Sequence, residues 1–289
     1  MAIQTLCLLC KRSMEMVELC RPSFGSIVRC PRCGLVRVFP PRLPEQLARL
    51  HNDPEFFNDP YFDKRDLSQD SFVAKKRALL NMLTEGCTVK GARILDIGCD
   101  TGSLLTVARD EFGMVGLGVD VSHHAARIAR EEYGLQVLVG QITELKLPRA
   151  SFDFIIMVDV IEHVADPAAF LSKVYQLLRN GGKVYISTSE HDALVNTIGL
   201  TLYRLLGTRA LGLLEKKLYI PYHEFYFTQA TLAQLVRQSG LQIVHHAKRE
   251  FPISDIHGIL LKLALAPIFA VQRFLGRQTL QELVGIKAL

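Results

Sequence analysis

The stretch ILDIGCDTGSLL, residues 94–105, decides the fold of this 289-residue chain. An apolar run leads into a turn with two glycines, and a helical pattern of apolar residues follows at once. This order is typical of the first strand–turn–helix unit of a parallel sheet, where ligands bind beyond the carboxyl ends of the strands. The turn reads Gly98-Cys-Asp-Thr-Gly102, so Asp100 stands where a nucleotide-binding turn often has another glycine.

The carboxylate of Asp100 restricts the ligand that this turn accepts. The G-x-G-x-x-G fingerprint of dinucleotide sites places a pyrophosphate at the helix N-terminus, and an acidic side chain would repel it. A ligand with net positive charge removes this objection. S-adenosylmethionine carries a sulfonium and an ammonium group against one carboxylate. Asp is also among the residues that adopt the left-handed conformation most readily, so Asp100 is compatible with such a turn.

Strand-like and helix-like patterns alternate across residues 91–190, which predicts a parallel sheet with crossover helices. Among the helices, PAAFLSKVYQLLRNGG ends in a Gly pair that suits a C-cap. Beyond residue 220, TQATLAQLVRQSG predicts a helix and LQIVHHAKRE a strand. The strands expected before it are ARILDIG, MVGLGVDV, LQVLVG, FDFIIMVDV and KVYISTS.

Residues 91–190 resemble the class I S-adenosylmethionine-dependent methyltransferases. DIGCDTG is similar to their first motif, (D/E)-x-G-x-G-x-G, with Asp100 departing at the middle glycine. FDFIIMVDVIEHVADP, residues 152–167, resembles the fourth strand and following loop of the type 23 subgroup, which includes the ubiquinone-biosynthesis O-methyltransferases. The resemblance implies a Rossmann-like α/β sheet with flanking helices, methyltransferase activity and S-adenosyl-L-methionine as cofactor.

The same resemblance assigns a cofactor site. Asp120 ends the second strand, where a carboxylate takes the ribose hydroxyls in related folds. Gln141 stands at the adenine position, where the family often has Asp. Asp159 either lines the methionine end of the pocket or caps its loop. The expected cofactor-binding residues are Asp96, Gly98, Cys99, Asp100, Gly102, Asp120, Val121, Gln141, Ile142 and Asp159.

Methyl transfer to a hydroxyl group needs a base, for which His is the usual candidate. His163, in IEHV, directly follows the fourth strand; it is either a general base or substrate orienter, or a structural residue that holds the loop. His223, in PYHEFYFT, lies in a segment that resembles the one closing over the substrate in the family. We expect His163 and His223 to be the catalytic residues.

The other histidines are weaker candidates. The pair His245-His246 lies on a predicted strand and is expected to be structural. The pair His123-His124 begins a predicted helix, where it borders the adenine or caps the turn. His191 follows the fifth strand and is a minor pocket candidate.

Four cysteines near the start of the chain form two C-x2-C pairs, Cys7 with Cys10 and Cys30 with Cys33. This pattern predicts a structural four-thiolate zinc site, with an iron–sulfur cluster or plain dithiols as alternatives. A segment of about 38 residues cannot build a large core, so bound metal would drive its folding. The total of seven cysteines is odd, which argues against disulfides and for a cytoplasmic protein.

Two apolar stretches, residues 193–214 and 258–277, are interrupted by basic residues such as Arg209 and Lys262. This composition suits peripheral contact with the inner face of a membrane, as a lipid-linked acceptor would require. The alternative is that the stretches pack on each other or across a dimer. An aromatic cluster in the preceding linker forms either a lid over the cofactor or interdomain packing; it contains Phe57, Tyr61 and Phe62.

The chain therefore divides into a small metal-binding part, a linker, a catalytic domain with one insertion, and a tail. We predict transfer of a methyl group, at oxygen, to a small or lipid-linked metabolite of the glycan, quinone or secondary-metabolite type. An RNA methyltransferase is one alternative, although a net charge of +5 is mild and the cysteine segment has few aromatic residues for base stacking. A non-catalytic cofactor-binding scaffold is the other. The parts are a zinc-ribbon-like segment at 1–38, linker and lid helices at 39–90, the methyltransferase domain at 91–250 with an amphipathic insertion at 191–220, and an apolar helical tail at 251–289.

Overall fold

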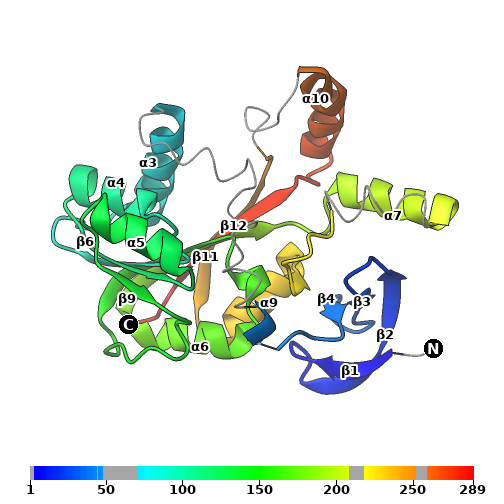
Figure 1. The fold of residues 1–289 in the computed structure, drawn as a ribbon, viewed down its shortest axis with the longest axis horizontal. Coiled ribbons are helices and arrows are strands. Elements are labelled where there is room, and N and C mark those ends of the chain that lie inside the picture. The colour runs from blue at the N-terminus through cyan, green and yellow to red at the C-terminus, as the bar shows by residue number, and fades with distance from the viewer. Residues whose placement is uncertain (1–2, 44, 48–69, 208–217, 252–258) are drawn as a thin grey trace.

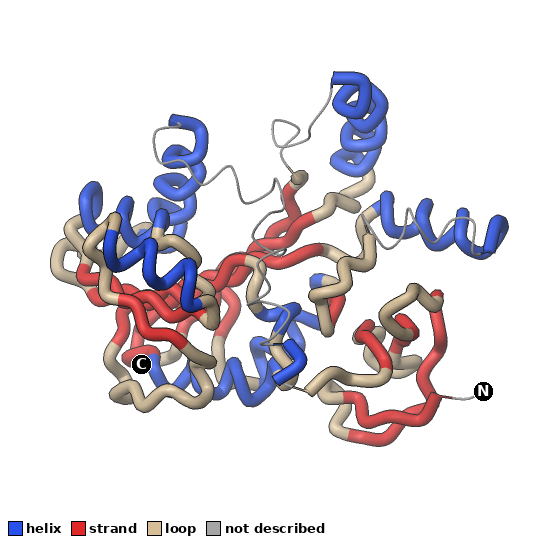
Figure 2. The backbone as a smooth tube through the Cα atoms, in the orientation of Figure 1, coloured by secondary structure: helices blue, strands red, loops and turns tan. Residues whose placement is uncertain are grey.

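Two β-sheets organise the protein, whose computed structural model describes residues 3–43, 45–47, 70–207, 218–251 and 259–289. The larger sheet lies at the centre, and a smaller sheet built by the N-terminal segment lies beside it (Figure 1). Figure 2 shows helices on both faces of the larger sheet. The expected α/β architecture with a separate N-terminal segment is confirmed.

The larger sheet has seven strands. They are β5 (Arg93–Ile97), β6 (Val115–Asp120), β7 (Val137–Val139), β8 (Phe152–Val158), β9 (Leu178–Ser189), β11 (Gln242–Arg249) and β12 (Leu280–Ile286). Their spatial order is β11-β12-β9-β8-β5-β6-β7. The strands from β9 to β7 are parallel, whereas β12 is antiparallel to both of its neighbours. The carboxyl ends of β5, β6, β7 and β8 therefore meet at one edge.

Helices cover the two faces because successive strand residues point to opposite sides. Ile94 belongs to a buried cluster with residues of three helices, and Leu95 belongs to a second cluster with residues of two others. The first three helices are α3 (Asp70–Thr84), α4 (Ser103–Phe112) and α5 (His123–Glu131). The other two are α6 (Pro167–Leu177) and α9 (Gln229–Gln238), and the short η2 (Ile161–His163) follows β8.

The end of α6 differs from the expectation. The Gly pair at 181–182 does not cap α6, because the helix ends at Leu177 and β9 begins at the next residue. Gly181 has φ 75°, and its N–H donates to the carbonyl of Lys287 at 2.8 Å. The glycines thus shape the start of β9 where it meets the chain beyond β12.

The expectation of a wholly helical tail at 251–289 is wrong in its second half. The helix α10 (Ile259–Phe274) is present, but Leu280–Ile286 form β12 between β9 and β11. Leu283 and Val284 point to opposite faces, and both are buried. A strand covered on both faces has no polar alternation, so LQELVGI continues the apolar pattern of the helix before it.

The smaller sheet contains the N-terminal segment and one strand from far along the chain. Its members, in spatial order, are β1 (Ile3–Cys7), β2 (Arg12–Cys20), β3 (Ser26–Arg29), β4 (Val36–Phe39) and β10 (Phe225–Tyr226). All neighbours are antiparallel, and Phe225 pairs with Arg37. The catalytic part of the chain therefore completes the sheet of the N-terminal segment.

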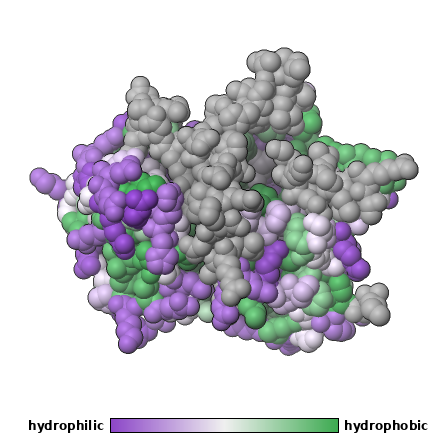
Figure 3. All heavy atoms as spheres, viewed as in Figure 1, coloured by the Kyte–Doolittle hydropathy of each residue, from purple (hydrophilic) through white to green (hydrophobic). Residues whose placement is uncertain are grey.

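The two apolar stretches contain the helices α7 (Leu194–Leu206) and α10, which project from the body in different directions (Figure 1). Hydrophobic residues gather along α7 on the right of Figure 3. Leu205 is 76% exposed and Phe274 is 89% exposed. Within the described ranges, no helix has the length and hydrophobicity to cross a bilayer. Three residues expected to form a lid or interdomain packing, Phe57, Tyr61 and Phe62, lie outside the described residues, as does Arg209.

Candidate active site

The glycine turn after β5 is packed tightly against side chains from other parts of the chain. Gly98 and Gly102 have φ angles of 74° and 84°. A Cβ atom on Gly98 would lie 2.5 Å from the side chain of Val160, and one on Gly102 would lie 2.2 Å from that of Leu135. Asp100 adopts φ 52°, so the residue that replaces the middle glycine takes the left-handed conformation that a glycine would take.

Asp120, at the end of β6, holds the turn in place. One carboxylate oxygen accepts from the N–H of Asp100 and the other from the N–H of Ser122, both at 2.8 Å. A carboxylate has about four lone-pair positions, so both oxygens retain capacity for ribose hydroxyls. Ser122 caps α5 by accepting from the N–H of Ala125, and His123 and His124 are the first two residues of that helix.

The charge at this edge is mainly negative. Asp96 is 5% exposed, and burial raises its pKa to about 7, against the opposing effect of Lys76. Lys76 comes from α3; burial lowers its pKa, while three neighbouring carboxylates oppose that change. These carboxylates belong to Asp96, Asp100 and Asp159. Lys76 was not expected from the sequence, since one lysine in KKRALL looks like any other on an exposed helix face.

The remaining residues expected at the cofactor lie around the same edge. Gln141 and Ile142 follow β7, and Ile142 is 2% exposed, so it offers a buried apolar surface. Val121 follows Asp120 and is half-buried. Cys99 differs from the others, because its side chain packs inward: a Cβ on Gly118 would lie 2.6 Å from its sulfur. The Cys99 thiol is therefore part of the core.

His163 and His223 lie together, although 59 residues separate them in the chain. Their ring centroids are 4.8 Å apart, and the rings are nearly perpendicular at 88°. His163 Nδ1 lies 3.0 Å from the carbonyl oxygen of Tyr222. Asp159, the first residue after β8, has φ 53°, and its N–H donates to the carbonyl of Ser187 at 2.9 Å. The loop after β8 therefore carries both the expected cofactor residue and the expected base.

Glu162 joins this pair and was missed in the sequence. It is 1% exposed, and among the described residues neither of its carboxylate oxygens accepts a hydrogen bond. Burial, and then the charge of Asp159, raise its pKa to about 8. One donor atom each from Glu162, His163 and His223 lie within 4.8 Å of one another, so this group has the composition of a divalent-cation site. The signal in the sequence that could have identified Glu162 was an acidic residue inside the apolar run VIEHV.

The other histidines have structural partners. His191 contacts the hydroxyl of Tyr219 at 3.1 Å and is 9% exposed. His246 contacts Gln281 at 3.0 Å across β11 and β12, and His245 lies 3.7 Å from Glu282. These contacts agree with the structural role expected for the pair His245-His246.

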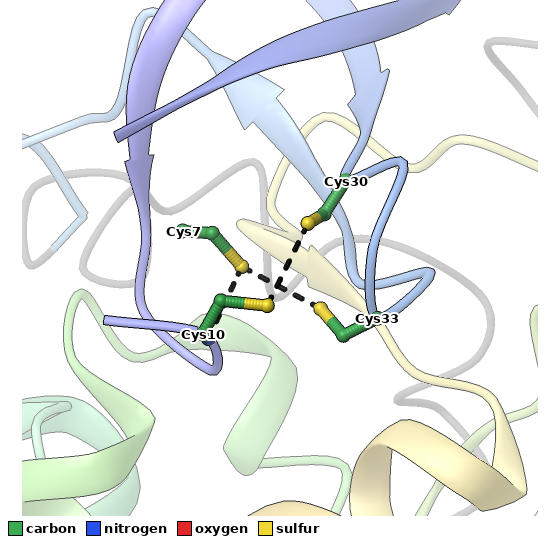
Figure 4. A group of neighbouring side chains, drawn as sticks. All are labelled: Cys7, Cys10, Cys30 and Cys33. Carbon is green, nitrogen blue, oxygen red and sulfur yellow. Dashed lines mark hydrogen bonds between the residues drawn. The ribbon is translucent and has the colours of Figure 1, made fainter. Parts of the chain in front are cut away.

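The four N-terminal cysteines converge from the β1–β2 and β3–β4 turns (Figure 4). The sulfurs of Cys7 and Cys33 are 3.5 Å apart, and those of Cys10 and Cys30 are 3.8 Å apart. A hydrogen bond from Cys33 lowers the pKa of Cys7. Gly34, with φ 80°, lets its N–H donate to the carbonyl of Cys30 at 3.0 Å. The four sulfurs thus have the number and spacing of a group that could hold a metal ion.

Comparisons with known proteins agree with this architecture. A family model described as "Methyltransferase domain" matches residues 69–246. A ubiquinone biosynthesis O-methyltransferase of Nitrosococcus oceani is 33% identical over 171 residues, which cover 57% of this chain and 69% of that protein. A ubiquinone biosynthesis O-methyltransferase of Coxiella burnetii is 27% identical over 187 residues, or 61% of this chain and 77% of that protein.

A solved structure of phosphoethanolamine N-methyltransferase 2 from Haemonchus contortus, with phosphomonomethylethanolamine and S-adenosylhomocysteine, matches with a TM-score of 0.58 at 17% identity. The match covers 88% of this chain and 63% of that one. At this identity the likeness shows the fold alone. The fold is that of the S-adenosylmethionine-dependent methyltransferases. Since the family match spans more than half of its length, the chain belongs to the methyltransferase-domain family and is an S-adenosylmethionine-dependent methyltransferase.

Proposed function

We propose that this enzyme methylates a hydroxyl oxygen of a quinone-type aromatic acceptor, free or lipid-linked. The observation that carries the proposal is the facing pair His163 and His223 beside the cofactor edge. A hydroxyl acceptor must lose its proton as the new bond forms, and a positioned imidazole is suited to that task. The names of the two curated relatives support oxygen as the methylated atom and a quinone-type acceptor.

S-adenosylmethionine supplies an activated methyl group when bound. Its net positive charge fits an edge with several carboxylates. Asp120 would accept from the ribose hydroxyls, and Lys76 would pair with the methionine carboxylate. Gln141 and Ile142 would contact the adenine. The full proposed set is Lys76, Asp96, Gly98, Cys99 through its backbone, Asp100, Gly102, Asp120, Val121, Gln141, Ile142 and Asp159.

The hydrogen bond of His163 defines which ring nitrogen takes the proton. A carbonyl oxygen only accepts, so the neutral ring carries its proton on Nδ1, facing Tyr222, and its lone pair on Nε2. His163 Nε2 would accept the hydroxyl proton, and His223 would orient the acceptor. Burial raises the pKa of Glu162, and positive charge on a protonated His163 beside it would oppose that rise.

We also infer that the four cysteines bind one structural Zn²⁺. A Zn–S distance of about 2.3 Å in a tetrahedron separates neighbouring sulfurs by about 3.8 Å. The two S–S distances of 3.5 Å and 3.8 Å support this assignment. Native mass spectrometry of the protein purified without chelator tests it directly. One added mass of zinc supports the site, and a metal-free protein with a folded N-terminal sheet overturns it.

A lipid-linked acceptor is supported by the exposed apolar residues of α7 and α10. Leu205 and Phe274 are accompanied by the exposed Arg204 and Arg273, a combination suited to an anionic membrane surface. We expect the enzyme to sediment with vesicles that contain phosphatidylglycerol, and the double substitution Leu205→Ser and Phe274→Ser to abolish this. Equal sedimentation of both proteins would exclude contact through these helices.

The central test offers S-adenosylmethionine with three acceptors: 3,4-dihydroxybenzoate, the same catechol with a prenyl tail, and unmodified transfer RNA. We expect S-adenosylhomocysteine and a methylated catechol, with a lower KM for the prenylated one. His163→Asn should lower kcat about 100-fold with cofactor affinity retained. His245→Asn, on β11 at the opposite side of the larger sheet from β7, is the control.

Each other outcome of this test identifies an alternative. Methylated RNA without methylated catechol would favour an RNA methyltransferase. Bound cofactor with no product from any acceptor would favour a non-catalytic scaffold. Parallel reactions with Mg²⁺ and with EDTA determine whether the group of Glu162, His163 and His223 uses a divalent cation. Equal rates would mean that His163 acts as the base without a cation.

A further inference from the structure

The side chain of Glu224 is an ion buried between the two parts of the molecule. It is 0% exposed and follows His223 directly. Arg42 donates to it twice, through Nη1 at 2.8 Å and through the backbone N–H at 3.2 Å. Arg37, on β4 and only 4% exposed, places its guanidinium 3.9 Å from the same carboxylate. Both arginines belong to the N-terminal segment or to the residues just after it.

The backbone around Glu224 links these arginines to the candidate active site. Its N–H donates to the carbonyl of Glu162 at 2.8 Å, and its carbonyl accepts from Val38 at 3.0 Å. Arg42 also donates to the carbonyl of His223 at 3.4 Å. The carbonyl of Tyr222, two residues earlier, is the partner of His163 Nδ1. The segment 222–224 thus connects the small sheet to both histidines.

We propose that Arg37, Arg42 and Glu224 are positioning residues that fix the tautomer of His163 and the orientation of His223. On this view the N-terminal segment forms a wall of the acceptor site. The metal held by its cysteines then supports methyl transfer at a distance, through β4 and β10. The inference rests on the proposed function of His163, and it adds the residues that hold His163 ready to accept a proton.

The energetics of buried charge support a positioning role. Burial raises the pKa of Glu224, and hydrogen bonds and charges from Arg42 and Arg37 oppose the rise. When a partner is removed from such a group, an uncompensated charge remains in a water-excluded place, so the segment must move or take up a proton. A rigid arrangement of this kind defines one conformation of 222–224, and even a small displacement of a catalytic group is costly to rate.

The N-terminal segment also offers a matched control pair. Arg21 donates to Glu18 in a bidentate arrangement at 2.7 Å and 2.9 Å. The side chains of Arg21 and Glu18 are 64% and 32% exposed, and no hydrogen bond or ion pair among the described residues joins either of them to β10. Exposed pairs of this kind contribute little to stability. Glu18→Gln therefore makes the same chemical change in the same small sheet, away from the acceptor site.

The experiment compares wild type, Glu224→Gln, Arg42→Lys, Arg42→Met and Glu18→Gln in three measurements. The first is a ¹⁵N spectrum of histidine-labelled protein, with His163 assigned by its loss in His163→Asn. The second is S-adenosylmethionine affinity by calorimetry. The third is kcat with the prenylated catechol. Glu224→Gln should mix the two tautomers of His163 and lower kcat about 100-fold, with affinity within roughly twofold of wild type.

Arg42→Lys, which keeps a charge, should fall between Arg42→Met and wild type, and Glu18→Gln should match wild type. An unchanged His163 tautomer with unchanged kcat in Glu224→Gln would overturn the proposal. So would a loss of cofactor affinity as large as the loss of kcat, because the residues would then support the whole domain. If wild type methylates no catechol, the proposed function fails, and the ¹⁵N spectra still decide whether Glu224 positions His163.

Discussion

The two halves of the candidate active site are assembled in opposite ways. The cofactor edge comes from consecutive strand–turn–helix units between β5 and β8, and its groups are fixed by local hydrogen bonds such as Asp120 to Asp100. The acceptor side joins the N-terminal segment, the loop after β8 and residues 220–226 through the buried charge of Glu224. The cofactor edge depends on residues that are close together in the sequence, whereas the acceptor side depends on contacts between residues that are far apart in the sequence.

This difference separates what a relative can share from what is particular to this chain. The family match covers residues 69–246 and so includes the cofactor edge. Arg37, Arg42 and the four cysteines precede that range. The matched range therefore includes the cofactor edge, the loop after β8 and Glu224, whereas the two arginines beside Glu224 lie before it.

Substitution of a cysteine in the N-terminal segment should separate the two halves of the site most completely. Cys30→Ser should abolish metal binding, which is worth about 10–16 kcal/mol in small zinc domains, and unfold the small sheet. Hydrogen exchange of residues 3–39 should rise to that of an unfolded chain, with S-adenosylmethionine affinity retained. Cys87→Ser, at an exposed cysteine, is the control. Equal protection in both variants would show that the small sheet folds without the metal.

The acceptor half should also respond to pH through Glu162. Its pKa rises from 4.5 in the unfolded chain to about 8 in the fold, so the folded protein keeps a proton that the unfolded chain has lost. Its contribution to stability is present below about pH 4.5 and is lost as pH rises to about 8, by about 5 kcal/mol in all. Urea unfolding across this range should show the decline. Glu162→Gln should reduce the decline and leave the part that comes from Asp96, whose pKa burial raises to about 7, whereas Glu15→Gln, at an exposed site, should leave it unchanged.

The substitution Asp120→Ala tests the cofactor half of the site. This change removes the proposed ribose acceptor and two backbone hydrogen bonds of the turn. We expect S-adenosylmethionine to bind about 100-fold more weakly, a loss of about 2.7 kcal/mol. Calorimetry with Asp110→Ala, an exposed carboxylate on α4, provides the control. Unchanged affinity would mean that the cofactor lies elsewhere.

The smallest effect concerns the packing beneath the turn. Gly118→Ala would place a Cβ 2.6 Å from the sulfur of Cys99, which should destabilise the fold by about 2 kcal/mol. The double variant with Cys99→Ala should recover most of this, because the crowded sulfur is gone. Urea unfolding of the two single variants and the double variant measures the coupling. Additive effects would indicate that Gly118 is constrained by its other neighbour, Val137.

The sequence predicts the parts of the fold that depend on neighbours in the chain. The strands from β5 to β9, the left-handed Asp100 and the convergence of the four cysteines all follow from local pattern and spacing. The closeness of His163 and His223 was implied only by their resemblance to a family. Their contact depends on a chain reversal between residues 163 and 223 that no local pattern encodes.

Three features could not be predicted for the same physical reason. Lys76 and Glu224 are charged residues of kinds that usually face solvent, and their sequence neighbours do not reveal the carboxylates or arginines around them. The strand β12 is covered on both faces, so its apolar pattern does not separate it from a helix. In each case the decisive contact is with a residue distant in sequence.

The position of β12 has a consequence for synthesis. Although β12 follows both β9 and β11 in the chain, it lies between them in the larger sheet. Until residues 280–286 emerge from the ribosome, the nascent chain holds β9 with an open edge and β11 without its neighbour. Open strand edges recruit other chains. Residues 280–286 therefore end this exposure to aggregation, and a chain cut short before β12 would remain in that state.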